Sequence, residues 1–163
     1  MGRLQHLLMP RWWLRRRFPP ATLAAITQAI RVAEAEHAGE IRFAIETCLD
    51  LRRLFRPGAG RQRARELFAQ LDVWDTRANN GVLIYVLLAA HEIHIVADRG
   101  LADGVGAEEW QAVCRLMEKR FREGAFEAGA IAGIAAVSAL VGRHFPPRPG
   151  DRNELPDEPV VLG

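Results

Sequence analysis

The clearest helical pattern in the chain lies between residues 108 and 121. Apolar side chains recur there every three or four positions, at Trp110, Val113, Cys114, Met117 and Phe121. Acidic residues open the segment and basic residues close it, which is the arrangement that the helix dipole favours. The spacing predicts an amphipathic helix whose apolar stripe faces the core.

Two earlier segments are also typical of helices. The first begins after Pro20, with Thr22 as its expected N-cap and Gly39 as its expected end. The second follows the Gly/Pro break at residues 57–60 and carries its apolar positions within residues 64–71. Both stripes predict helices that bury one face.

A last helical segment covers residues 126–141 and is rich in alanine. Gly129 and Gly133 would let this helix pack very close to a neighbour. The uncharged stretch from 128 to 142 has 15 residues, whereas about 20 are needed to span a bilayer. We therefore expect a buried helix and not a membrane span.

Three segments have the patterns of strands. Residues 40–47 alternate between apolar and polar positions, which is typical of a strand with one well-buried face. Residues 81–89 are apolar on both faces and should form a central strand. Residues 92–98 alternate again, so the last two segments should form an antiparallel hairpin that turns near residues 90–91.

The order of these elements predicts an α/β fold. The first strand, the second helix and the second strand form a βαβ unit, so those two strands should be parallel with a right-handed crossover. The third strand should run antiparallel to the second. We expect a three-layer α/β/α sandwich, Rossmann-like, around a small mixed sheet of three or four strands.

Length and charge divide the chain into three parts. With 163 residues, one domain is expected, over residues 20–145. An N-terminal arm, residues 1–19, precedes it, and a Pro-rich acidic tail, residues 146–163, follows. The net charge is +2, but residues 1–17 carry five arginines and no acid, so the other residues sum to −3. This balance argues against a nucleic-acid surface over the domain as a whole.

The arm has two interpretations. Leucines and tryptophans stand beside arginines in residues 4–18, a composition that could lie on an anionic membrane surface. Alternatively, the arm is structural and its aromatic side chains pack on the domain, since Pro10 interrupts any continuous amphipathic helix.

Several other features exclude function classes or favour ordinary structural roles. The N-terminus lacks the charge order and apolar run of a signal peptide, which favours a cytoplasmic protein, at most peripheral at the inner membrane. Cys48 and Cys114 fit small core positions.

Ser138 is the only serine, which excludes a serine hydrolase, and the sequence has no phosphate-binding loop motif. His91 and His94 should point to opposite faces of the hairpin, so solvated histidines are favoured over a zinc site.

Polar residues gather where the first two strands begin and the third ends. They are Glu40, Asp75, Asn79, Asn80, Asp98 and Arg99. The topology brings these positions to one edge of the sheet, and carboxylate and amide oxygens are the ligands that Ca²⁺ or Mg²⁺ prefers. The sequence pattern alone favours a structural role over a cation site: Asn79 and Asn80 would shape a turn, Asp98 would cap a loop, and Arg99 would pair with it.

The same segments carry a resemblance to a known family. The relevant residues are Trp74-Asp75, NNGVLIY at 79–85, IVADRG at 95–100, and Phe121, Gly124, Phe126 and Gly129. In this spacing they resemble the TPM domain family over residues 20–145, and the two termini resemble small bacterial members that lack a membrane span. The resemblance implies an α/β/α sandwich with a divalent-cation site near these acidic and amide positions.

The resemblance also implies phosphatase activity. A plant thylakoid-lumen member involved in photosystem II repair is regarded as an acid phosphatase, whereas other members are membrane-tethered or modulate a receptor. We expect a weak Ca²⁺ or Mg²⁺ site formed by Glu40, Asp75, Asn79, Asn80 and Asp98. A weak metal-dependent phosphatase is the activity that the resemblance implies. The residues leave two routes open for a phosphorylated substrate: catalysis by the bound metal, or Asp98 as nucleophile with Arg99 holding the phosphate, and the spacing does not choose between them. The alternative is a non-catalytic interaction module acting at the membrane surface or in membrane-protein maintenance.

Overall fold

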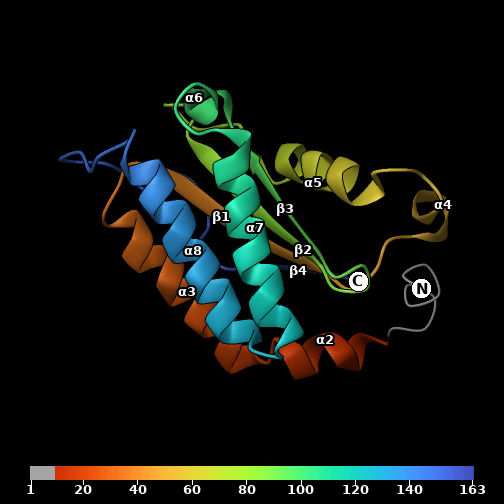
Figure 1. Ribbon diagram of the computed structural model, residues 1–163. Helices are drawn as coiled ribbons and strands as arrows, with labels where there is room; N and C mark the ends of the chain where they lie inside the picture. The colour runs from red at the N-terminus through yellow and green to blue at the C-terminus, as the bar shows by residue number, and fades with distance from the viewer. Residues whose placement is uncertain (1–9) are drawn as a thin grey trace.

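A four-stranded sheet forms the centre of the computed structural model, which describes residues 10–163. The strands are β1 (Glu40–Glu46), β2 (Gly81–Leu87), β3 (Glu92–Ala97) and β4 (Val160–Leu162), in the order β3-β2-β1-β4. β1 is parallel to β2 and β4, and β3 is antiparallel to β2 (Figure 1). The expected mixed sheet and βαβ unit are confirmed, and the tail supplies the fourth strand.

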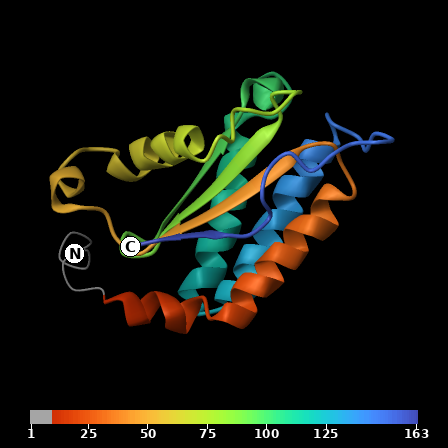
Figure 2. The same ribbon diagram turned by 180° about the vertical axis from the view of Figure 1, so that it is seen from behind.

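Helices cover both faces of this sheet. The helices are α2 (Arg11–Arg17), α3 (Pro20–Glu34), α4 (Leu51–Leu54), α5 (Ala59–Gln70), α6 (Arg99–Ala102), α7 (Ala107–Arg122) and α8 (Phe126–Gly142). α3, α7 and α8 pack on one face, and α5 packs on the other (Figures 1 and 2). The three-layer α/β/α arrangement is therefore as predicted.

The central position of β2 explains its uninterrupted apolar sequence. All seven of its residues are buried. Val82, Ile84 and Val86 face the layer of α3, α7 and α8, while Leu83 and Leu87 face α5. A strand that is covered on both faces cannot alternate with polar residues without burying them.

The amphipathic stripe of α7 packs against the small residues of α8. Val113, Cys114 and Met117 are buried, and Trp110 and Phe121 at the two ends of the stripe are only partly buried. A Cβ atom added to Gly133 of α8 would lie 2.2 Å from the Met117 sulfur. The close approach that the α8 sequence predicts is present. No helix within residues 10–163 is long and apolar enough to cross a bilayer.

Three local expectations are wrong. Thr22 is not the N-cap of α3: Pro19 holds that position, and the Thr22 hydroxyl instead donates a hydrogen bond of 2.7 Å to Glu127 on α8. α3 ends at Glu34, well before Gly39, whose missing side chain makes room for Val141. The hairpin turn is longer than expected, because β2 ends at Leu87 and the next four residues form the loop.

The described part of the N-terminal arm packs on the domain. Leu14 and Phe18 are buried, and the Phe18 ring meets the rings of Phe121 and Phe126 edge-on, with centroids 6.0 and 5.7 Å away. α2 is thus held to the core by its inner side chains. Residues 4–9 of the predicted membrane-binding segment lie outside the described residues.

Candidate functional site

The polar residues predicted for one edge of the sheet do lie where β1 and β2 begin and β3 ends. Glu40 pairs with Gly81 across the parallel strands. The backbone N–H of Asp98 donates a 2.9 Å hydrogen bond to the carbonyl of Gly81 on its other side. Glu40, Gly81 and Asp98 therefore stand in a row across three neighbouring strands, which we call the rim.

The backbone of Val73 packs against Gly81, the middle residue of this rim. A Cβ atom added to Gly81 would lie 2.1 Å from the Val73 carbonyl oxygen, so the backbone of Val73 rests directly on the glycine. Glu40 and Asp98 are two strand spacings apart, which is roughly 10 Å. Because Gly81 stands between these two residues in the row, the Val73 backbone that packs on it lies between the Glu40 and Asp98 side chains in this arrangement.

The carboxylate of Glu40 accepts hydrogen bonds from the C-terminal tail. Its two carboxylate oxygens accept the backbone N–H groups of Glu154 and Leu155, each at 3.1 Å. The side chain is buried, and burial raises the pKa of Glu40 while the two N–H groups oppose the rise. The carboxylate therefore anchors the tail over the first residue of β1.

Asn79 and Asn80 form the turn that leads into β2. Asn79 has a positive φ of 52°, a conformation that asparagine tolerates better than most residues. The Asn80 backbone N–H donates to the Thr76 hydroxyl, and its side-chain amide donates a 2.7 Å hydrogen bond to the carbonyl of Ala38. The amide oxygen of Asn80 is buried and has no hydrogen-bond partner among the described residues.

Asp98 caps the short helix α6. Its Oδ1 accepts the backbone N–H of Arg99 at 2.7 Å, and its Oδ2 is buried without a hydrogen-bond partner within residues 10–163. The Arg99 side chain is exposed, so the contact between the two residues is a backbone cap. Asp75 is also exposed, in the loop that follows Val73.

Gly100 fixes the distance between α6 and the asparagine turn. Its N–H donates a 2.8 Å hydrogen bond to the Asn79 carbonyl. A Cβ atom at this position would lie 2.3 Å from that oxygen and 2.8 Å from the carbonyl oxygen of Ala78. Two carbonyl oxygens are thus packed beside the residue that follows Arg99.

The predicted ligand set is therefore only partly assembled. Asn79, Asn80 and Asp98 belong to two segments in backbone contact, whereas Glu40 holds the tail and Asp75 projects from the surface. No three His, Cys, Asp or Glu side chains within the described chain are grouped as a metal site. Within this set, Asn80 Oδ1 and Asp98 Oδ2 are buried side-chain oxygens without a hydrogen-bond partner among the described residues.

A polar cavity, which the sequence pattern does not indicate, lies beside the rim. It measures about 340 Å³ and is lined by residues of α3, the start of β1 and the tail. Burial raises the pKa of Glu34 to about 9, and a hydrogen bond to Asp157 adds to the rise. Burial lowers the pKa of His37, whose Nδ1 accepts the Gly39 N–H at 3.1 Å. Glu34 and Asp157 are far apart in sequence, so only the folded tail brings them together.

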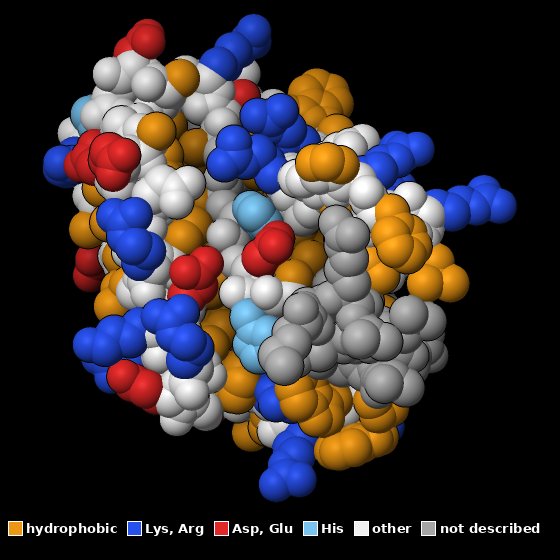
Figure 3. Space-filling view, turned by 45° about the vertical axis from the view of Figure 1, so that its right-hand side comes forward, with side chains coloured by type: hydrophobic (Ala, Val, Ile, Leu, Met, Phe, Trp, Pro, Cys, Tyr) orange, Lys and Arg blue, Asp and Glu red, His pale blue; other side chains and the backbone are white. Residues whose placement is uncertain are grey.

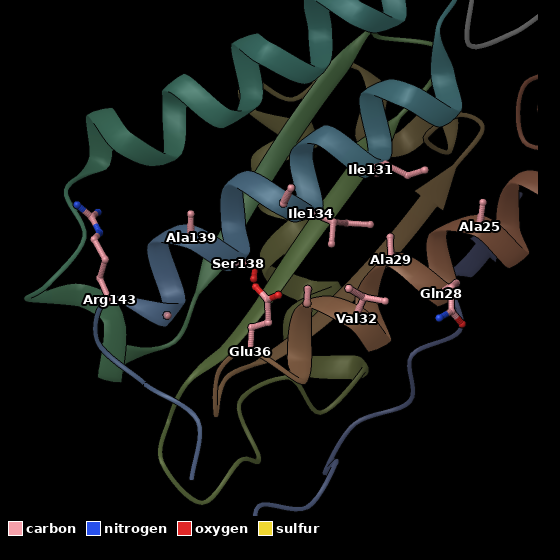
Figure 4. Close-up of a pocket in the computed structure, with 13 residues that line it drawn as sticks. Ala25, Gln28, Ala29, Val32, Glu36, Ile131, Ile134, Ser138, Ala139 and Arg143 are labelled. Atoms are coloured by element: carbon pink, nitrogen blue, oxygen red, sulfur yellow. The ribbon is translucent and has the colours of Figure 1, made fainter.

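Another cavity is an open groove of about 800 Å³ between α3 and α8 (Figure 4). Alanines, Val32, Ile131 and Ile134 form most of its lining. Glu36 and Arg143 lie toward the end of the groove where α8 finishes (Figure 4). Ser138 is part of this lining.

Comparisons with known proteins agree with the fold. Residues 16–140 match the TPM domain. The NMR structure of the BA42 protein from the psychrophilic bacterium Bizionia argentinensis is 30% identical, with a TM-score of 0.75 over 86% of this chain and 92% of that one. The N-terminal domain of a P. gingivalis protein shares the fold at 19% identity, with a TM-score of 0.58 over 80% and 82% of the two chains. No curated protein matches the chain.

Proposed function

The chain belongs to the TPM domain family, and we propose that it binds a divalent cation, Ca²⁺ or Mg²⁺, at the rim beside Asn80 and Asp98. The observation that carries the proposal is the pair of buried oxygens, Asn80 Oδ1 and Asp98 Oδ2, that lack hydrogen-bond partners in the described chain. A buried acceptor without a partner costs about 1–3 kcal/mol. A bound cation would remove that cost.

The chemistry of the neighbouring groups supports this assignment. Carboxylate, amide and carbonyl oxygens are the ligands that Ca²⁺ takes, and Mg²⁺ accepts the same groups together with water. Asp98 would supply the negative charge and Asn80 an amide oxygen, and the carbonyls of Ala78 and Asn79 lie beside Gly100. A site with one carboxylate should be weak, with a Kd for Ca²⁺ in the range of about 10⁻⁴ to 10⁻³ M.

Slow hydrolysis of phosphomonoesters is the activity that this site supports. A bound cation would polarise a phosphoryl oxygen. The exposed Arg99 guanidinium would hold the phosphate through its planar fork. Asp98 would attack the phosphorus, the ester oxygen would leave as the alcohol with a proton from water, and a second water would hydrolyse the aspartyl phosphate to release phosphate and free Asp98. Asp98 Oδ1 already accepts the Arg99 N–H, so the carboxylate is partly engaged, and turnover should be slow.

A non-catalytic interaction module is the second candidate. The rim holds together segments that are far apart in sequence, because Asn80 binds the carbonyl of Ala38 and Glu40 binds the tail. Cation binding at Asn80 and Asp98 would stiffen the turn at residues 76–80 against α6. That change alone could alter the surface that a partner recognises.

Thermal unfolding with Ca²⁺ or Mg²⁺ tests the cation site. We compare the unaltered protein with Asp98→Asn and with Asp103→Asn, which changes an exposed aspartate at the other end of α6. Asparagine caps helices as well as aspartate does, so Asp98→Asn should leave α6 intact. At about 100 times the Kd, the cation should add about 2.7 kcal/mol of stability to the unaltered protein and to Asp103→Asn. An equal gain in Asp98→Asn would contradict the site.

The same proteins, assayed on p-nitrophenyl phosphate with the cation and with chelator, separate the two candidates. Turnover that requires the cation and is lost in Asp98→Asn supports the phosphatase. Cation binding without turnover supports the interaction module.

A further inference from the structure

A second basic segment in the sequence complements the N-terminal arm. Residues 50–66 contain six arginines and two acidic residues, a local charge of +4. Residues 1–17 carry +5, and because the whole chain carries +2, all other residues together sum to −7. The positive charge of this protein is therefore concentrated in two separate segments.

The fold brings α2 and α4, which belong to the first and second of these segments, to the same end of the molecule. α4 follows directly after β1, and it lies at the end where the C-terminus and the first turn of α2 are also found (Figures 1 and 2). α2 is fixed there because Leu14 and Phe18 are buried in the core. The rim lies at the opposite end of the strands, near α6 (Figure 1).

This end also exposes large apolar side chains. Trp12 on α2 is 56% exposed, Leu51 on α4 is 55% exposed, and Phe55, which follows α4, is 64% exposed. Arg15, Arg52 and Arg56 are exposed beside them. We call these six residues, Trp12, Arg15, Leu51, Arg52, Phe55 and Arg56, the docking face. Figure 3 shows apolar and basic side chains interspersed over this end of the molecule.

Not every arginine of the second segment belongs to this face. Arg63 binds the buried carboxylate of Glu46, and Arg53 pairs with Asp50 and Glu66. These two guanidinium groups serve the fold by joining α5 to β1 and α4 to α5. Arg52 and Arg56, by contrast, are exposed to solvent.

We propose that the docking face binds the surface of a bilayer that contains anionic lipid, with α2 and α4 both in contact. Arginines attract anionic headgroups, and tryptophan, leucine and phenylalanine gain free energy when they enter the boundary between headgroups and acyl chains. A surface that recognised only the charge of a polyanion, such as a DNA duplex, would gain nothing from the exposed Leu51 and Phe55. In this orientation the rim points away from the lipid.

Sedimentation with lipid vesicles tests the proposal on the full chain. The vesicles contain phosphatidylcholine alone or phosphatidylcholine with about 30% phosphatidylglycerol, at about 50 mM and about 500 mM NaCl, because salt screens the headgroup charge. We expect binding to the anionic vesicles that weakens at high salt, and little binding to phosphatidylcholine alone. Absence of binding to anionic vesicles at low salt would overturn the proposal.

Two double variants examine α4 while the N-terminal arm stays intact. Arg52→Gln/Arg56→Gln should weaken binding about thirtyfold, which corresponds to about 1 kcal/mol for each arginine near the surface. Leu51→Ser/Phe55→Ser should weaken it by at least about tenfold. The matched controls are Trp74→Ala and Arg115→Gln, which change exposed residues elsewhere and should bind as the unaltered protein does. Circular dichroism and thermal melting confirm that each variant is folded.

Two results would show that the proposal is wrong. If the controls lose as much affinity as the α4 variants, the binding depends on total charge and not on this face. If a short DNA duplex binds as tightly as the anionic vesicles, and Leu51→Ser/Phe55→Ser alters neither, the surface recognises polyanions and not lipid.

Discussion

The hydroxyl of Tyr85 on β2 donates a 2.6 Å hydrogen bond to Oε2 of Glu46 on β1. Arg63 on α5 reaches the same carboxylate, with its Nε 2.9 Å from Oε2 and its Nη2 3.1 Å from Oε1. Burial, followed by the contact with Glu46, raises the pKa of Tyr85, so the hydroxyl remains a donor at neutral pH. Three side chains thus connect both central strands to the helix that covers them.

Tyr85→Phe should destabilise the protein. The change removes one hydrogen bond to a buried carboxylate and leaves that lone pair without a donor. A hydrogen bond to a charged group is worth about 1.5–3 kcal/mol, and the free energy of unfolding should fall by this amount. Urea denaturation measures it. A loss below about 0.5 kcal/mol would mean that Arg63 alone satisfies Glu46.

The sequence predicts the layers of this fold because burial leaves a pattern in it. β2 is apolar on both of its faces. This is expected of a strand that α5 covers on one side and that α3, α7 and α8 cover on the other. The stripe of α7 has helical spacing because one face meets the core. These patterns are local, so they can be recognised without knowledge of the partners.

Features that depend on distant partners were not predictable in the same way. β4 has only three residues, and it is a strand because Val160 and its neighbours pair with β1. The sequence also places Glu40 among possible cation ligands, since nothing near it indicates that Glu154 and Leu155, more than a hundred positions away, donate to its carboxylate. The edge of the sheet was predicted correctly, whereas the contact between Glu40 and the tail was not predicted.

Gly81 and Gly133 should respond differently to alanine. At Gly81 the new Cβ atom would lie 2.1 Å from the backbone oxygen of Val73, which cannot move without shifting the loop. We expect Gly81→Ala to cost at least about 3 kcal/mol, the upper end for overpacking. At Gly133 the neighbour is the flexible end of Met117, and alanine gains about 1 kcal/mol of helix propensity. Gly133→Ala should therefore cost about 1 kcal/mol or less.

Urea denaturation of the two glycine variants provides the comparison. Each serves as the control for the other, because both add one methyl group at a buried glycine. Equal losses would show that the Val73 loop moves as readily as the Met117 side chain.

Glu34 should make the stability of the protein depend on pH. Its pKa is raised from 4.5 to about 9 in the folded state, first of all by burial. Between these two values the unfolded chain loses the proton and the folded chain keeps it, so the free energy of unfolding falls as the pH rises. For one proton the slope is at most about 1.4 kcal/mol per pH unit.

Glu34→Gln isolates this effect. Glutamine can accept the Ile41 N–H, as Glu34 Oε1 does at 2.7 Å, and can donate to Asp157 as the protonated carboxyl group does. The variant and the unaltered protein should be similarly stable near pH 5, and the variant should become the more stable one toward pH 8. Urea denaturation at several pH values measures the difference. Parallel pH profiles for the two proteins would mean that Glu34 ionises normally in the folded state.

Glu40→Gln and Asp98→Asn should separate the tail anchor from the cation site. Glu40 accepts two backbone N–H groups of the tail, and the amide of glutamine has only one acceptor oxygen, so one N–H would face an NH₂ group. The free energy of unfolding should fall by about 1–3 kcal/mol in Glu40→Gln even when chelator is present. The stabilisation by Ca²⁺ should persist, because Val73 lies between Glu40 and Asp98. Asp98→Asn should show the reverse pattern, with stability in chelator nearly unchanged and the response to Ca²⁺ lost. If Glu40→Gln also abolishes the Ca²⁺ response, the two carboxylates act on one ion, and the loop that carries Val73 must move when that ion binds.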